Sequence, residues 1–540
     1  MDDSSDLFRR LEQLNAIGAA LSKERDIDRL LESILIAAKT ITHADGGTLY
    51  RTTEDGKALR FEILRTDSLN IAMGGTTGIP INFPNLPLRD DHGAANDSMV
   101  AAYAAIHDKT VNIVDAYCEA GFDFSGTRRF DERTGYRSQS FLTVPMKNHE
   151  GEIIGVLQLI NALDPATRKV TPFSAADQSL AESLASQAAI ALTNRQLISQ
   201  LEDLFEAFIN LINLAIDEKS PYTGGHCQRV PALTMMLAEA ADAAAEGPLA
   251  AFKMDERDRY ELKIAGLLHD CGKVTTPVHV VDKATKLQTL FDRIKLIDTR
   301  FEVLKRDAEL HALRRQLALR QNVNPEAEEQ IWQAYQEDIH ALEEDREFLR
   351  KANVGGEAMK DDDLQRVRDI GSHRKWRNVD GVETEFLNAD EVINLTIRAG
   401  TLTLKERDII NYHIVATIKM LEQLPWPKHL TKVPEYAGGH HERMDGKGYP
   451  KGLTREQMSV QARMMGIADI FEALTARDRP YKPGMKLSQA MSIMANFRKN
   501  GHIDPDLFEV FIKQGVYRRY AEQFLDPAQI DVVDETALTG

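Results

Sequence analysis

Residues 440–450 have the sequence HHERMDGKGYP, and residues 269–274 have the sequence HDCGKV. Both lie in the second half of the chain, where the apolar spacing predicts helices almost throughout. Imidazole and carboxylate groups are ligands for divalent Fe, Mn, Zn and Ni. Neighbouring side chains on a helix are rotated by about 100° from each other, so an adjacent pair can reach two ions. The two segments therefore predict a dinuclear metal site in a helical domain.

Further candidate ligands lie in apolar, helical contexts at His226, His413 and Asp469. Two metal ions about 3.5–4 Å apart can clamp a phosphoryl group for in-line displacement by water. Lys273 follows His269 by one turn, where its ammonium would offset charge on a phosphate oxygen. The pattern favours hydrolysis of a phosphoester.

The order of the motifs resembles the HD-GYP family, a branch of the HD phosphohydrolase superfamily, over about residues 205–522 apart from an insertion. HDCGKV is followed by DKATKL at 282–287 and by LTLKERDIINYH, which ends at His413. HHERMDGKGYP comes next, and ADIFEALTARDRPYK occupies residues 468–482. Several separate motifs in family order make this resemblance specific.

The resemblance implies a phosphodiesterase that hydrolyses cyclic di-GMP or a related cyclic dinucleotide. By motif, the metal ligands would be His226, His269, Asp270, His413, His440, His441 and Asp469. Asp270 would bridge the metals and Lys273 would contact the scissile phosphate, as the catalytic pair. The substrate contacts would be Lys273, Arg479, Lys482, Tyr449, Gly446 and Gly448. Tyr449 would either pack on a base or buttress its loop, and the sequence leaves both roles open.

Two departures from the family pattern affect these expectations. Members with a third metal carry a glutamate four residues before the first histidine, and Tyr222 stands there in this chain. We therefore expect two divalent ions, with Fe or Mn favoured and Ni or Zn compatible, and linear pGpG as the product. Further conversion to GMP stays open. The RPYK segment lies one residue farther along than expected, which leaves the roles of Arg479 and Lys482 open.

Two other functions remain alternatives. The site could bind a cyclic dinucleotide and signal without turnover, although an intact set of ligands argues against a silent sensor. The same chemistry could also act on a hybrid cyclic dinucleotide.

Residues 26–193, after a helix over 1–25, resemble a GAF sensor domain of the mixed α/β type. Two runs at 46–64 and 141–160 each flank a Gly-containing turn and predict hairpins. The Asn-Lys…Phe…Asp-Glu signature of such domains is partial: Asn161, Phe173 and Asp177 are present, but Ala162 and Gln178 replace the lysine and the glutamate. The implied partner is an unknown small ligand, with a cyclic nucleotide as one candidate and an unliganded dimerisation domain as the alternative. The sequence assigns no ligand-pocket residues.

A long helix is predicted to connect the domains. Over residues 194–217, apolar residues from Leu197 to Ala215 alternate steps of four and three, which is typical of a coiled-coil seam. We expect a homodimer, although a core-facing helix of a monomer has the same spacing. The all-α HD-GYP domain would span 218–540, with a charged helical-hairpin insertion at about 291–400. Residues 361–380 are interpreted as a loop.

Composition limits the partners and the location. The 540-residue chain exceeds the size of one core and has a net charge of −17, which disfavours nucleic acid. Three cysteines without a CxxC pair indicate free thiols rather than disulfides. The absence of a signal-peptide pattern and of long apolar runs predicts a cytoplasmic protein without membrane insertion.

Overall fold

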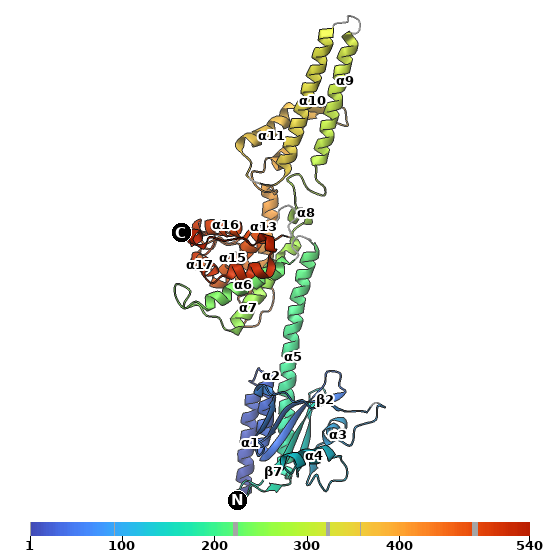
Figure 1. Ribbon diagram of the computed structural model, residues 1–540, viewed down its shortest axis with the longest axis vertical. Coiled ribbons are helices and arrows are strands. Elements are labelled where there is room, and N and C mark those ends of the chain that lie inside the picture. The colour runs from blue at the N-terminus through green and yellow to red at the C-terminus, as the bar shows by residue number, and fades with distance from the viewer. Residues whose placement is uncertain are drawn as a thin grey trace. The chain divides into compact units, whose positions relative to one another are not determined.

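The computed structural model describes residues 2–90, 92–219, 225–319, 325–356, 358–477 and 484–539 (Figure 1). The chain divides into two compact units, residues 1–205 and 206–540, which are described separately below.

The first unit is built on one sheet, whose paired strands are all antiparallel. Its path runs β3-β2-β1-β7-β6-β5, with β4 paired to β2 and β8 paired to β7. The strands are β1 (Ala44–Thr52), β2 (Ala58–Thr66), β3 (Ile71–Gly74), β4 (Leu86–Pro87), β5 (Val111–Ile113), β6 (Phe141–Lys147), β7 (Ile153–Leu163) and β8 (Val170–Thr171). The pairs β1–β2 and β6–β7 are antiparallel, which confirms both predicted hairpins.

Helices cover both faces of this sheet (Figure 1). One face packs against α1 (Asp2–Leu21), α2 (Ile27–Thr42) and the first part of α5 (Ala175–Lys219), and their leucines, isoleucines and alanines form the main core. The other face packs against α3 (Val100–His107) and α4 (Ser125–Thr134) in two smaller clusters. A short 3-10 helix, η1 (Gly75–Thr77), follows β3. The predicted α/β domain is confirmed.

Asp177, the aspartate of the partial signature, forms an ion pair with the guanidinium of Arg10 on α1. Arg10 also donates to the carbonyl of Ile41 at 2.6 Å. This arrangement ties α1 and α2 to the start of α5.

The second unit is helical except for one small sheet. Its regular core contains α6 (His226–Asp242), α7 (Glu256–Leu268), η2 (Cys271–Thr275), α8 (Val278–Val281), α13 (Leu404–Glu422), α14 (Val433–Gly438), η3 (Arg455–Gln457), α15 (Val460–Thr475), α16 (Leu487–Lys499), α17 (Pro505–Lys513), α18 (Val516–Phe524), η4 (Pro527–Gln529) and α19 (Glu535–Thr539). In this core α6 packs against α7 and α15, and α13 packs against η2, which follows α7. The predicted helical fold is confirmed.

The helical hairpin expected between residues 291 and 400 is present. It consists of α9 (Ile294–Leu319) and α10 (Pro325–Asn353), followed by α11 (Asp361–His373) and α12 (Ala389–Leu395). These helices enclose a separate hydrophobic core, which includes Phe301, Leu349 and Phe386. The insertion is thus a small folded body rather than a single solvated arm.

The interpretation of residues 361–380 as a loop is wrong. Residues 361–373 form α11, and β9 (Lys375–Arg377) pairs with β10 (Glu383–Glu385). Three aspartates in the first turn of α11 favour its N-terminus. Leu364, Val367 and Ile370 are buried, and the last two belong to the insertion core. The many charged residues obscured the apolar spacing of an amphipathic helix.

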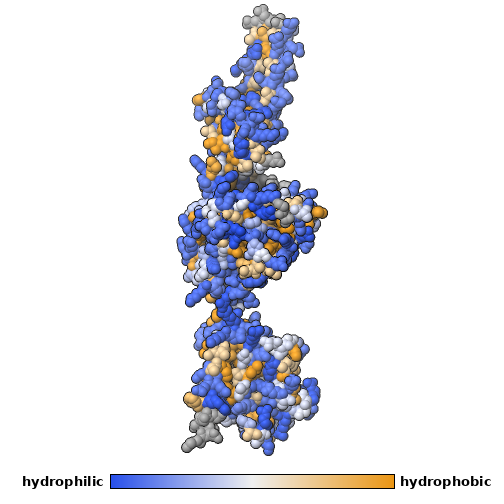
Figure 2. All heavy atoms as spheres, turned by 90° about the vertical axis from the view of Figure 1, so that its left-hand side faces the viewer, coloured by the Kyte–Doolittle hydropathy of each residue, from blue (hydrophilic) through white to orange (hydrophobic). Residues whose placement is uncertain are grey.

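The surface of the molecule is predominantly hydrophilic on the face drawn in Figure 2, with apolar side chains in scattered patches. The apolar side chains of the predicted seam on α5 are exposed: Leu197, Leu201, Leu204, Phe208 and Leu211 are each 49–67 % exposed. Among the helices of the described residues, none is long and apolar enough to cross a membrane.

Candidate metal centre

Three predicted ligands meet at the junction of α6 and α7. His226 opens α6, and His269 and Asp270 follow α7 directly. The Nε2 atom of His226 lies 3.0 Å from Asp270 Oδ2 and 3.3 Å from His269 Nε2. All three side chains are buried, and their ligand atoms lie within 4.8 Å of one another. This group has the donor types and spacing of a divalent metal site.

A second group lies beside the first. His413 on α13 and the adjacent His440 and His441, which follow α14, also place their ligand atoms within 4.8 Å of one another. The Nε2 atoms of His413 and His441 are 3.2 Å apart. Two such groups supply donors for two ions.

Asp270 stands between the two groups. Its Oδ2 atom faces His226 and His269, at 3.0 and 3.3 Å, while its Oδ1 atom lies 3.3 Å from His413 Nε2. A carboxylate that directs one oxygen to each cluster has the arrangement of a bridging ligand. Asp469 on α15 adds an oxygen 3.4 Å from His226 Nε2.

One buried nitrogen in this centre has no protein partner among the described residues. His440 is 2 % exposed, and its Nε2 atom makes no hydrogen bond. A buried polar atom without a partner is costly, and a metal ion would satisfy it. The donor set and this orphaned nitrogen both fit a pair of divalent ions.

Backbone carbonyls orient three of the histidines. The Nδ1 atoms of His269, His413 and His440 donate to the carbonyl three residues earlier, at 2.7, 2.5 and 2.6 Å. This bond leaves each Nε2 without its proton and free to bind a cation. Such outer-sphere bonds fix the tautomer and the ring orientation of metal-binding histidines.

His226 is oriented by a carboxylate instead. Its Nδ1 atom donates to Glu472 Oε2 at 2.6 Å, and Glu472 is 1 % exposed on α15. Arg229 balances this buried charge by donating from Nε to Glu472 Oε1 at 2.7 Å. Glu472 therefore links α6 to α15 and sets the direction of the first histidine.

The carboxylates of the centre are held ionised. Burial acts to raise the pKa of Asp270, but the Lys273 ammonium outweighs it and holds that pKa well below its usual range. The pKa of Asp469 is likewise well below its usual range, because the hydrogen bond from His226 outweighs burial. Both carboxylates are therefore ionised and can serve as metal ligands.

The paired histidines are held neutral. Burial, with His441 and His269 nearby, puts the pKa of His440 well below its usual range. Burial also lowers the pKa of His441 to about 4. His226 is the exception, because hydrogen bonds to Asp270, Asp469 and Glu472 outweigh its burial and raise its pKa. Neutral imidazoles beside ionised carboxylates are ready to bind cations.

Comparison with known protein families gives three matches. Residues 26–192 match the GAF domain, residues 223–345 match the HD domain, and residues 389–507 match a further HD domain family. The chain carries a GAF domain followed by an HD domain. The combination of a GAF domain with an HD domain, which the motifs predicted, is confirmed.

Curated relatives match segments of the chain. A cyclic di-GMP phosphodiesterase of Pseudomonas aeruginosa is 37% identical over 147 residues, which are 27% of this chain and 34% of that protein. The 3'3'-cGAMP-specific phosphodiesterase 1 of Vibrio cholerae is 43% identical over 81 residues, 15% of this chain and 19% of that protein. A cGMP-specific 3',5'-cyclic phosphodiesterase of Drosophila virilis is 32% identical over 146 residues, 26% of this chain and 15% of that protein. The matches thus span about a third or less of each of these relatives.

Lys273 lies inside the HD-domain centre, as the motif predicted. Its ammonium is 2.5 Å from Asp270 Oδ2, and η2 carries it. The turn is fixed from two sides: Gly272 N donates to Thr417 Oγ1 on α13 at 2.9 Å, and Lys219 Nζ at the end of α5 donates to the carbonyls of Lys273 and Val274 at 3.1 and 2.5 Å. The last residue of α5 therefore contacts the turn that holds the catalytic candidate.

Gly272 is required by close packing in this turn. A Cβ atom there would lie 2.0 Å from the carbonyl oxygen of His413 and 2.5 Å from Thr417 N. Both neighbours are backbone atoms, so no side chain can move aside. Cys227 and Cys271 are buried nearby, and burial raises their pKa values to about 12 and about 11. Both thiols therefore stay protonated.

The loop after His441 is clamped by the glutamate of HHERMDGKGYP. Glu442 is buried and accepts from the amides of Lys451 and Leu453, at 2.7 and 2.9 Å. Gly448 passes so close that a Cβ atom would lie 2.5 Å from the Cα of Glu442. Gly446 adopts a positive φ of 74°. The two glycines therefore shape the loop.

The ring of Tyr449 stacks on His441, with centroids 4.8 Å apart and an interplanar angle of 22°. The buttressing role is therefore the one that the geometry supports. Arg479 and Lys482, and also Tyr222, lie outside the described residues.

Four residues with clear roles were missed by the sequence reasoning: Glu442, Glu472, Arg229 and Lys219. Glu472 carries a usable signal, since it follows Asp469 by one helical turn and shares its face of α15. Glu442 follows the histidine pair directly. The roles of Arg229 and Lys219 depend on contacts between distant segments.

Proposed function

We propose that this protein is a metal-dependent phosphodiesterase of the HD-GYP type that hydrolyses cyclic di-GMP to linear pGpG. The observation that carries the proposal is the position of Asp270, whose two oxygens face two separate groups of histidines. Family matches to HD domains and relatives named cyclic di-GMP phosphodiesterases support it.

The chain's own residues supply the positioning. His226, His269, Asp270, His413, His440, His441 and Asp469 would hold two divalent ions, with Fe or Mn favoured. When bound, such ions activate water and polarise the phosphoryl group. Lys273 keeps its positive charge because Asp270 and Asp469 outweigh burial and raise its pKa. Its ammonium would neutralise a non-bridging phosphate oxygen as charge develops there.

Cyclic di-GMP is the first candidate substrate, and a hybrid cyclic dinucleotide is the second. The second is supported by the two Vibrio cholerae relatives named 3'3'-cGAMP-specific phosphodiesterases. A panel of both compounds, assayed at equal concentrations, ranks them by kcat/KM. Products are separated by chromatography, so pGpG and GMP are distinguished in the same run.

The GAF domain would regulate the HD domain through α5. This helix begins directly after the GAF sheet and ends at Lys219, whose ammonium binds the η2 carbonyls beside the metal centre. A small ligand in the GAF domain that altered the register of α5 would change those bonds. Candidate cyclic nucleotides that bind the GAF domain and leave kcat and KM unchanged would contradict this coupling.

The exposed seam of α5 would pair with a second copy of the chain. Leu201 and Phe208 are 67 % and 56 % exposed, which is costly for a monomer and suited to a coiled coil. Sedimentation of the wild type and of a Leu201→Glu/Phe208→Glu variant tests this. A homodimer that becomes a monomer in the variant supports the proposal, and equal masses contradict it.

The direct test of activity uses the full chain prepared without oxygen and loaded with Fe or Mn. Turnover of cyclic di-GMP that is lost in Asp270→Asn and His269→Ala is the expected result. Metal-loaded protein that binds cyclic di-GMP without turnover would instead establish a sensor.

A further inference from the structure

The motif DKATKL at residues 282–287 contains two lysines that the proposed chemistry does not use. It lies between α8 and the insertion, and both side chains are buried: Lys283 is 5 % exposed and Lys286 is 2 % exposed. Lysines are almost never fully buried without a partner, because removing an ammonium group from water is costly. The partners of each lysine therefore indicate what the motif does.

Lys283 joins the insertion to the helix that carries His413. Its ammonium donates to both carboxylate oxygens of Glu406 on α13, at 2.8 and 2.7 Å. It also donates to Asn394 Oδ1 on α12 of the insertion, at 2.8 Å. These three acceptors match the three protons of an ammonium group, and the side chain has no exposed surface.

The insertion side of this bridge is held in one orientation. The amide nitrogen of Asn394 donates to Asp390 O at 2.8 Å and to Asp390 Oδ2 at 3.2 Å, so Oδ1 is directed at Lys283. Asp390 in turn pairs with Arg293, which directly precedes α9, at 2.7 Å. Directly after the insertion, Thr401 Oγ1 donates to the carbonyl of Lys283 at 2.8 Å. Segments at both ends of the insertion are thus connected to this one lysine.

The other side of the bridge is the N-terminal cap of α13. Glu406 Oε2 accepts from the amide and the hydroxyl of Thr403, both at 2.8 Å, as part of a capping box. Burial acts to raise the pKa of Glu406, but the hydrogen bond from Lys283 outweighs it and lowers that pKa. Loss of Lys283 would leave this ionised carboxylate without its cation, which is costly for a partly buried charge.

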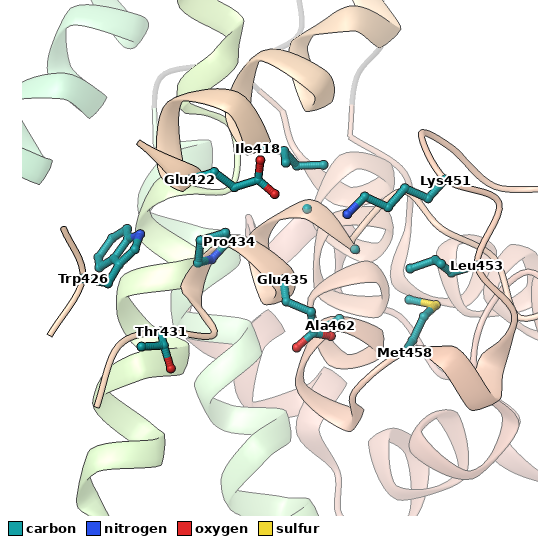
Figure 3. Close-up of a pocket in the computed structure, with 12 residues that line it drawn as sticks. Ile418, Glu422, Trp426, Thr431, Pro434, Glu435, Lys451, Leu453, Met458 and Ala462 are labelled. Atoms are coloured by element: carbon teal, nitrogen blue, oxygen red, sulfur yellow. The ribbon is translucent and has the colours of Figure 1, made fainter. Parts of the chain in front are cut away.

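The position of His413 depends on how α13 is held. His413 follows Glu406 by seven residues, a rotation of about 700°, so the two side chains lie on nearly the same face of the helix. The C-terminal half of α13 packs closely on α14: a Cβ atom on Gly438 would lie 2.7 Å from Ile418 Cγ1 (Figure 3). Its first turn is instead attached through the charge of Lys283. A change in that attachment would therefore shift the N-terminal half of α13 relative to the rest of the centre.

We propose that Lys283 is a positioning residue for the metal site formed by His413, His440 and His441 (the His413 site), and that the insertion acts on this site through Lys283. The inference rests on the proposed function, because it concerns the same metal centre. The ammonium of Lys283 bonds to α12 and α13 rather than to a metal ligand, and it sets the position of the first turns of α13. A displacement of α12 would change that position and thus the affinity of the site for its ion.

The test measures Zn affinity at both sites of the full chain by competition against a chelating dye, and it requires no turnover. Lys283→Met should weaken the His413 site about fivefold, which is less than the 10- to 100-fold effect of losing a direct partner of a ligand. The site that includes His226 should stay near the wild type. In a His441→Ala background, which lacks a ligand of the His413 site, Lys283→Met should have no further effect.

Lys286→Met is the matched control for Lys283→Met. It is the same substitution of a buried lysine in the same motif, but the Lys286 ammonium contacts Leu395 O at 3.3 Å and Met359 Sδ at 2.7 Å, both in the insertion. Both Zn affinities should therefore equal those of the wild type.

A second pair of variants tests the part played by the insertion. Asn394→Leu removes only the α12 side of the bridge and should weaken the His413 site about twofold, because the ion pair with Glu406 remains. Glu391→Gln is its control: Glu391 is also buried on α12, but it pairs with Arg300 inside the insertion, so both Zn affinities should be unchanged.

Unchanged Zn affinity in Lys283→Met, or an equal loss at both sites, would overturn the proposal. So would an equal loss in Lys286→Met, which would indicate general loosening of the insertion. Wild-type affinity in Asn394→Leu would contradict the role of the insertion. Circular dichroism shows whether each variant keeps its fold.

These outcomes are distinguishable from failure of the proposed function. A wild type that binds fewer than two ions would contradict the metal centre itself, and this inference with it. A wild type with two ions and turnover, beside a Lys283→Met variant of unchanged affinity, would contradict this inference alone.

Discussion

Replacement of Glu472 by glutamine tests how the first metal ligand is held. The wild-type carboxylate accepts the Nδ1 proton of His226 at 2.6 Å and is balanced by Arg229. Glutamine has nearly the same shape but carries no charge. The variant therefore weakens the charge-assisted bond that orients the imidazole, and it leaves the guanidinium of Arg229 without its carboxylate.

The expected magnitude follows from the position of Glu472. It contacts a metal ligand without being one, and loss of such an outer partner costs about 10- to 100-fold in metal affinity. This corresponds to about 1.4–2.7 kcal/mol. Glu472 does not orient His413 or His441, so only the metal site that includes His226 should lose affinity. Titration should then resolve a weakened site and an unchanged one.

The assay is competition for Mn or Zn against a chelating dye at fixed pH, which requires no turnover. Glu261→Gln serves as the matched control, because Glu261 is also buried and accepts from a backbone amide, Lys432 N at 2.6 Å, but does not contact a histidine of the centre. Equal affinities at both sites of Glu472→Gln would refute the reasoning. So would an equal loss in the control, which would indicate general destabilisation.

Three further predictions concern the turn and the insertion. Lys219→Met should lower kcat about fivefold, because the η2 carbonyls lose their hydrogen bonds to the ammonium. Its metal content should be unchanged, and Lys219→Arg should have a kcat near that of the wild type in the same steady-state assay. Gly272→Ala should lose bound metal and about 3 kcal/mol of stability, read from elemental analysis and thermal unfolding; a fully loaded variant would contradict the packing argument. Lys286→Met should stabilise the insertion by about 3 kcal/mol below pH 8, because burial lowers the pKa of Lys286 from 10.5 to about 8. Because the pKa of Lys286 is lower in the folded than in the unfolded chain, the cost of burying its charge is full below pH 8 and declines to zero by about pH 10.5. Hydrogen exchange at pH 8 and at pH 10.5 should therefore show the stability gap between the variant and the wild type becoming smaller. A gap that stays constant with pH would contradict this reasoning.

The candidate ligands could be found from sequence because metal chemistry restricts the residue types and the helical framework fixes their spacing. His269 and Asp270 are adjacent, and so are His440 and His441. Each pair can therefore be recognised from a short stretch of sequence. The same is true of Gly448, whose loop geometry depends on neighbours in its own segment.

Residues whose roles arise only from packing between distant segments were not predictable in this way. Glu472 gains its role from the approach of α6 to α15, and Lys219 from the approach of α5 to η2. No local sequence pattern predicts such contacts between distant segments.

Charge density misled the interpretation of residues 361–380. Its acidic start suggested a solvated loop, although aspartates are favoured in the first turn of a helix. Leu364, Val367 and Ile370 recur at steps of three and are buried, and Val367 and Ile370 belong to the insertion core. The local period, taken with the first-turn charges, would have indicated the helix.

The measurement that tests the central claim most directly is the number of metal ions per chain in the wild type and in Asp270→Asn, determined by elemental analysis after anaerobic loading. If Asp270 bridges two sites, the wild type holds two ions per chain and the variant holds one or none. A wild type that holds a single ion, or a variant that keeps both, would contradict the account.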